Sequence, residues 1–166
     1  EKVWFELSRA PRDRSHGWRL GVLATTDGQA ADARHIVLRE VDATRRQLMF
    51  YADSRSPKVR QIEAYPAGTI VLCSAALGWQ LRLKVQLGIE SSGLAVSSRW
   101  ARLKMSPGAQ DYLSPLPPGT PVEHPAPERG SREHFSVVTA QIGGIDWLEL
   151  HAEGHRRAAF DAQGRR

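Results

Sequence analysis

Alternating apolar and polar residues mark a series of short segments and predict a protein built mainly of β-strands. Asp27-Gly28, a strong hairpin signal, follows the first of these segments. In the second half of the chain, Gly143-Gly144 separates two further segments. The expected strands are 18–26, 34–41, 47–52, 69–75, 79–89, 134–142 and 146–151, with a last short segment at 156–160. Many strands at short spacing, joined mostly by hairpins, favour an antiparallel barrel with flanking helices.

Four shorter stretches are typical of helices. Residues 2–9 carry apolar side chains on one face, and residues 96–103 and 107–112 show similar spacing. Ser56 is a plausible N-cap with Pro57 at the first helical position, and this helix should end near Tyr65-Pro66. Residues 114–129 hold six prolines. Because strand-like sequence resumes afterwards, we expect an ordered crossover there and not a domain linker.

Composition indicates one ordinary globular domain covering residues 1–166. The chain is long enough to bury a sizeable core, and its hydrophobic fraction of 41% is typical of soluble proteins. It contains neither an apolar run of about 18 residues, as a membrane helix needs, nor a signal-peptide pattern at its start. The single Cys73 lies in an apolar run and is expected to be buried. These features favour the cytoplasm and no membrane partner.

The formal charge of +5 raises the possibility of nucleic-acid binding. Much of this charge collects near the two ends of the chain, where solvated faces are the commoner explanation. We find no helix-turn-helix pattern and no basic residues interleaved with exposed aromatics along a strand. A basic nucleic-acid-binding barrel therefore stays a minor alternative, and no nucleic-acid partner is expected.

Metal and nucleophile chemistry find little support. His151 and His155 have the spacing of two zinc ligands on a helix, but Gly154 and the strand-like context argue against a helix there. No Gly-x-Ser-x-Gly elbow occurs, and Cys73 is flanked by apolar residues. We therefore expect no metal and assign no catalytic residue.

Cations between the apolar strands suit an anionic ligand. Lys58 falls in the first turn of the helix after Ser56, where backbone N–H groups and the helix dipole favour a phosphate. Arg34 and Arg39 bracket one strand, but a spacing of five places them on opposite faces, so two solvated arginines are equally compatible. Gln80 could hydrogen-bond a heterocycle, but the sequence by itself favours a solvent-facing polar stripe. Trp147 could cover a planar ring or belong to the core.

In this order and spacing the segments resemble the pyridoxamine 5′-phosphate oxidase-like, FMN-binding split barrels. Three stretches carry most of the similarity: Arg34 to Arg39 matches a family strand, Phe50 to Asp53 a strand end, and Ser56-Pro57-Lys58 a phosphate-binding corner. Trp79-Gln80-Leu81 resembles a further strand. Trp147 and Arg157 repeat a tryptophan followed ten residues later by an arginine.

The resemblance implies a six-stranded antiparallel Greek-key barrel that forms a homodimer, with FMN between the two subunits. It implies that Gln80 contacts the flavin and that Trp147 and Arg157 reach in from the partner subunit. The remaining implied FMN contacts belong to one subunit: Arg34, Ile36, Val37, Leu38, Arg39, Tyr51, Ala52, Ser56 and Lys58.

Departures from the family pattern bear on the substrate. Pro57 replaces an arginine of the phosphate corner, the segment 98–103 lacks the family's substrate-binding tyrosine, and Glu153 replaces a substrate-binding arginine. A carboxylate at that place would repel the phosphate of pyridoxamine phosphate. We therefore expect an FMN-dependent oxidoreductase acting on an unidentified small molecule, and the alternative is a non-catalytic protein that binds flavin or haem.

Overall fold

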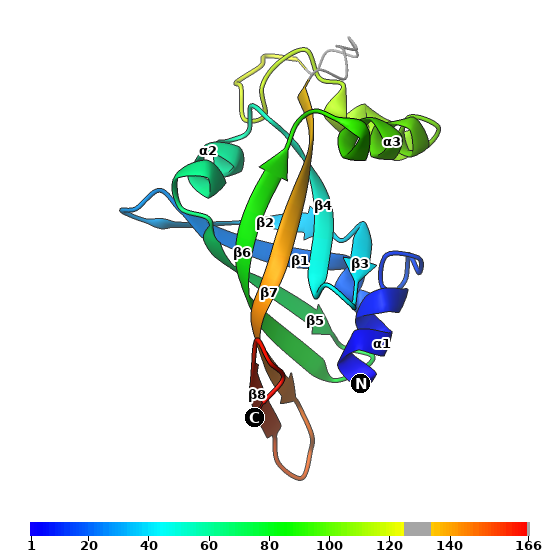
Figure 1. The fold of residues 1–166 in the computed structure, drawn as a ribbon, viewed down its shortest axis with the longest axis vertical. Helices are drawn as coiled ribbons and strands as arrows, with labels where there is room; N and C mark the ends of the chain where they lie inside the picture. The colour runs from blue at the N-terminus through cyan, green and yellow to red at the C-terminus, as the bar shows by residue number, and fades with distance from the viewer. Residues whose placement is uncertain (125–133, 166) are drawn as a thin grey trace.

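The computed structural model describes residues 1–124 and 134–165, and its main feature is one antiparallel sheet (Figure 1). Along this sheet the strands follow the order β2-β1-β5-β6-β7-β4-β3, and β8 pairs with β7. The strands are β1 (Leu20–Thr26), β2 (Ala31–Val37), β3 (Glu40–Asp42), β4 (Gln47–Asp53), β5 (Ala67–Ser74), β6 (Trp79–Glu90), β7 (Phe135–Glu149) and β8 (Arg156–Asp161). The mainly β, antiparallel fold predicted from the sequence is confirmed.

The sheet curls into a barrel because one extended segment pairs first with β1 and then with β4. We predicted a single strand over 34–41, but the structure divides it into β2 and β3. Between them the Leu38 N–H donates to the Arg19 carbonyl (2.8 Å), and the Arg39 N–H donates to the Met49 carbonyl on β4 (2.9 Å). With β2 and β3 counted as one, β1 to β7 give the six barrel strands, and β8 adds a hairpin.

The second half of the barrel differs from prediction at Gly143-Gly144. We expected these glycines to separate two strands, but β7 runs without interruption from Phe135 to Glu149. Its register against β6 shifts by one residue where Ile142 opposes Val85 and Gly144 opposes Lys84. Gly143 is the extra residue of a β-bulge, so the glycines bend this long strand and do not end it. The C-terminal part of β7 then projects from the barrel with β8 (Figure 1).

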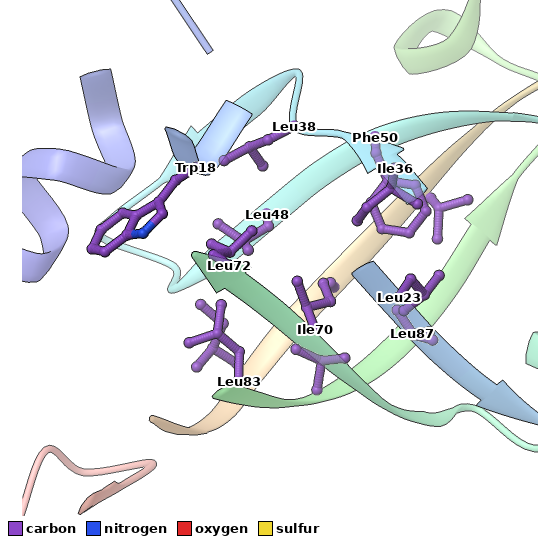
Figure 2. Close-up of a cluster of buried hydrophobic side chains, with 14 of the residues drawn as sticks. Trp18, Leu23, Ile36, Leu38, Leu48, Phe50, Ile70, Leu72, Leu83 and Leu87 are labelled. Atoms are coloured by element: carbon purple, nitrogen blue, oxygen red, sulfur yellow. The ribbon is translucent and has the colours of Figure 1, made fainter. Parts of the chain in front are cut away.

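The barrel interior holds the main hydrophobic core, built from the inward-facing side of every strand from β1 to β7. Figure 2 shows Trp18, Phe50 and Leu83 among these side chains, and each has no exposed surface. Alternation along β5 turns Ile70 and Leu72 inward and Cys73 outward. Our expectation that Cys73 is buried is therefore wrong: the thiol is exposed. The apolar run around it hid the two-residue period of the strand.

Three α-helices lie outside the barrel: α1 (Lys2–Arg9), α2 (Pro57–Ala64) and α3 (Leu94–Leu103). All three match the expected segments, and residues 107–112 form a 3-10 helix. A second core joins α3 to the upper end of β7 through Trp100 and Phe135. Residues 114–124 of the proline-rich stretch carry no helix or strand, and the rest of that stretch lies outside the described residues. No helix in the described part is long and apolar enough to cross a membrane.

Candidate functional site

The start of α2 contains a buried hydroxyl, that of Ser56. Ser56 occupies the N-cap position with extended backbone angles, and Pro57 begins the helix. The Ser56 side chain does not cap the helix, although serine at this place usually accepts a backbone N–H. It is 2% exposed, and its Oγ finds no hydrogen-bond partner among the described residues. Buried polar atoms are rarely left unpaired, so this hydroxyl is available to hydrogen-bond a group from outside the chain.

Lys58 adds a cation one residue into the same helix. Burial lowers the pKa of its ammonium group, and the positive charge of Arg34 lowers it further. Asp53 acts in the opposite direction, but this carboxylate already accepts from Arg55 at 2.6 Å. Within the described part of the chain Lys58 forms no ion pair. The positive charges of Arg34 and Lys58 therefore repel each other, and a bound anion would stabilise both.

Arg34 holds α2 against the β1–β2 hairpin. Its guanidinium donates to Thr25 Oγ1 on β1 at 2.6 Å and to Gln61 Oε1 on α2 at 3.0 Å. It also pairs with Asp32 at 2.6 Å. These contacts place the charge of Arg34 near Lys58, on the helix that begins after Ser56. We call these three residues the phosphate corner.

The phosphate corner fits a phosphate monoester by its chemistry. It combines a hydroxyl and an ammonium group that have no partner among the described residues, a second cation and the first backbone N–H groups of an eight-residue helix. A phosphate monoester brings about −1.5 to −2 charges and strong acceptor oxygens. The residues present therefore suit the phosphate end of FMN.

Arg39 lies apart from the phosphate corner, on the other face of its segment. Its guanidinium carbon sits 5.5 Å from the centre of the Tyr51 ring, and its Nε is buried without a partner among the described residues. Burial raises the pKa of the Tyr112 phenol, and the nearby Arg39 side chain opposes the rise. Arg34 and Arg39 thus lie in two separate environments, in line with the opposite faces expected from their spacing of five.

The apolar residues of the predicted set face the interior or lie half-buried. Ile36, Leu38 and Ala52 are buried in the core, and Val37 is half-buried. The side chains of Ile36, Leu38 and Ala52 fill the barrel, so only their backbone atoms are available for a ligand, whereas Val37 lies on the opposite face of its strand from Ile36.

Gln80, Trp147 and Arg157 lie on the far part of the barrel. Gln80 faces outward from β6, opposite the exposed Cys73. Trp147 packs against the main core with its ring 5.6 Å from that of Trp79, and its indole N–H has no partner among the described residues. Arg157 opposes Leu148 in the β7–β8 register, whereas Trp147 opposes Ala158. Trp147 and Arg157 therefore occupy opposite faces of one hairpin, and within a single chain they do not form one site.

Arg157 and Arg82 share one carboxylate on this outer face. Each guanidinium lies 2.6 Å from Asp146 Oδ2. The hydrogen bonds from Arg157, then those from Arg82, lower the pKa of Asp146 to about 2.

A second feature, missed from the sequence, is a polar cleft of about 810 Å³ between β3, β4 and α3. We call it the arginine cleft because Arg12, Arg39, Arg45, Arg99 and Arg102 line it. Glu40 also lines this cleft and accepts hydrogen bonds from two of its arginines. Arg99 donates to both carboxylate oxygens at 2.9 Å, and Arg102 donates to Oε1 at 3.3 Å. Arg99 and Arg102 are three residues apart on a helix, which was a signal that they share a face. The pairing with Glu40, 59 residues earlier, had no local signal.

Histidine, cysteine and carboxylate side chains do not gather into a metal site in the described part. No group of three or more is placed to hold an ion there. His151 and His155 lie in the turn before β8 and at its edge.

Comparisons with known proteins place this fold among flavin-binding barrels. No protein-family model matches the chain, and no curated protein matches it. A pyridoxamine 5′-phosphate oxidase-related, FMN-binding protein from Nostoc punctiforme superposes with a TM-score of 0.77 at 25% identity, over 96% of this chain and 88% of that one. PhzG from Burkholderia lata, solved with tetrahydrophenazine-1-carboxylic acid, gives 0.73 at 16% identity over 96% and 83%.

Haem binding also occurs on this fold. A haem-binding protein from Mycobacterium smegmatis superposes with a TM-score of 0.58 at 15% identity, over 96% of this chain and 59% of that one. The structural neighbours of the chain are thus pyridoxamine 5′-phosphate oxidase-related, FMN-binding split-barrel proteins, and the predicted resemblance is confirmed. The fold includes oxidoreductases and haem-binding proteins.

Proposed function

We propose that this protein is an FMN-dependent oxidoreductase that acts on a small molecule. The observation that carries the proposal is the phosphate corner, where the buried Ser56 hydroxyl and the Lys58 ammonium group both lack a partner among the described residues. The FMN-binding neighbour from Nostoc punctiforme supports the same cofactor. If Ser56 served stability alone, its buried hydroxyl would lack a hydrogen bond among the described residues, at a cost in free energy.

The proposed roles follow from position. Ser56, Lys58 and Arg34 would hold the phosphate of FMN, and the backbone of residues 36–38 and 51–52 would line the flavin. Arg39, whose Nε has no partner in the described part of the chain, lies beside Tyr51 and would face the polar side of the ring system. When bound, the flavin supplies hydride or electron transfer, and the protein binds it, orients it and excludes water.

The proposed site needs two copies of the chain. The phosphate corner lies at α2, and Trp147 and Arg157 lie on the β7–β8 hairpin at the opposite end of the molecule (Figure 1). One copy cannot bring both ends to one ligand, so a second copy would supply Gln80, Trp147 or Arg157. We therefore propose a homodimer with FMN at its interface.

The first test is the visible absorption spectrum of the freshly purified protein, with mass spectrometry of whatever denaturation releases. The proposal predicts a flavin spectrum and the mass of FMN. Replacing Lys58 and Arg34 together by alanine should strongly weaken FMN retention. Unchanged FMN affinity in that double variant would rule out the assigned site.

Haem is the second candidate ligand. The same absorption spectrum distinguishes haem from FMN, because haem gives an intense Soret band. A protein that binds either group without turnover would be distinguished by steady-state oxidation of reduced nicotinamide or by oxygen consumption with candidate amines.

A further inference from the structure

The arginine cleft contains a carboxylate in the place where an anionic ligand would be expected to bind. Glu40 receives Arg99 in a bidentate fashion, with Nε and Nη2 each 2.9 Å from one oxygen. Arg102 adds a third donor to Oε1. Bidentate pairing is the way arginine holds a carboxylate or phosphate of a ligand. Glu40 is 27% exposed and Arg99 18%, so this arrangement lies at the wall of the open cleft.

The other charges of the cleft have both signs. Asp42 and Glu90 add two further carboxylates to the lining, and Arg45 lies 3.9 Å from Asp42. Arg12 and Arg39 form no ion pair among the described residues. Tyr51 also turns its hydroxyl to Glu40 at 3.3 Å. Arg39 belongs both to this cleft and to the proposed flavin site, so the two adjoin.

We propose that Glu40 is a specificity-determining residue: its carboxylate occupies Arg99 and Arg102, so that these two arginines do not receive the phosphate of a substrate and the cleft favours small molecules without a phosphate group. A tethered group acts at a high effective concentration, and a free phosphate would have to displace it. A phosphate that entered beside it would meet a like charge, which strongly disfavours a wrong partner. The cleft is the substrate cleft only if the proposed function holds.

The test titrates inorganic phosphate into the wild-type protein and into variants by isothermal titration calorimetry, in a buffer without phosphate. Glu40→Gln keeps the size of the side chain and removes its charge. We expect Glu40→Gln to bind phosphate about tenfold more tightly than the wild type, or better. In the double variant Glu40→Gln/Arg99→Gln the gain should disappear. Both variants keep the phosphate corner, so their difference reports the cleft alone.

Two controls make the result specific. Asp42→Asn removes the same charge from the same cleft without freeing Arg99, and its phosphate affinity should stay within about twofold of the wild type. Arg99→Gln alone should also change little, because Arg99 is already occupied; this variant remains informative even if Glu40→Gln does not fold. An equal gain in Asp42→Asn, or a clear loss in Arg99→Gln, would overturn the role of Glu40. Since the titration needs neither flavin nor turnover, its failure is distinct from failure of the proposed function.

Discussion

We expect Lys58 to lower the stability of the apo protein and to raise its affinity for FMN. Replacing Lys58 by methionine separates these two effects. Methionine keeps an unbranched apolar side chain in the half-buried position and removes the charge. In the apo protein, burial and the nearby charge of Arg34 lower the pKa of Lys58, so its charged form is disfavoured by folding. We therefore expect Lys58→Met to make the apo protein more stable.

The size of each effect can be estimated from the type of interaction. Removing an unfavourable charge commonly yields about 0.5–2 kcal/mol, and we expect the lower end, which is a rise of roughly 1–4 °C in Tm for a chain of this size. A hydrogen bond to a charged group contributes about 1.5–3 kcal/mol, so the variant should bind FMN about 10- to 150-fold more weakly.

The pH dependence has a definite sign. The unfolded lysine titrates near 10.4 and the folded one below it, so between the two values the unfolded state binds more protons. Wild-type apo protein should gain stability as the pH rises through the folded pKa of Lys58 toward that value. Lys58→Met should not show this rise in stability with pH.

The assay is flavin fluorescence quenching for the dissociation constant, with thermal unfolding of the apo protein followed by circular dichroism. Arg60→Met is the matched control: Arg60 lies exposed on the same helix, and neither quantity should change much. FMN affinity within about twofold of the wild type in Lys58→Met, or an equal loss in Arg60→Met, would refute the assignment of Lys58 to the phosphate.

Three further predictions concern the barrel and its charged groups. Leu83→Ala empties a fully buried position of β6 and should cost about 2–5 kcal/mol in urea unfolding, whereas Leu94→Ala at an 83% exposed position should cost little; similar costs would contradict the core described above. Burial and, next, Glu40 raise the pKa of Tyr51 to about 12, so Glu40→Gln should lower the pKa of this phenol in an ultraviolet titration; an unchanged value would exclude contact with Glu40. The Asp146 carboxyl should titrate near pH 2 by NMR, so its contribution to stability is present above about pH 4 and lost as the pH falls toward 2; a normal value would show that Arg82 and Arg157 do not hold it.

Local sequence was enough to predict most elements of the fold. The N-cap and Pro57 defined α2, and the alternation in 79–89 defined β6, because these signals act within a few residues. The bulge at Gly143 was misjudged, since a glycine pair inside a strand and a glycine pair at its end look alike without the partner strand. Cys73 was misjudged because an unbroken apolar run conceals which residues face outward.

The candidate site was predictable only in part, and for a physical reason. The phosphate corner depends on a helix start and one adjacent strand, so its residues could be named from motifs. The arginine cleft joins Glu40 on β3 to Arg99 on α3, and such a contact is determined by how the barrel closes. Trp147 and Arg157 were predicted as a pair, but the hairpin register directs them to opposite faces, which no spacing rule for a single strand could reveal.

The central claim, that the phosphate corner at α2 binds the phosphate of FMN, is tested most directly by comparing FMN with riboflavin. The two share the ring system and differ in the phosphate alone. Titration of the apo protein should give an FMN dissociation constant about 100-fold or more below that of riboflavin, since two charge-assisted contacts are lost. Equal affinities, or no binding of either flavin, would contradict the account.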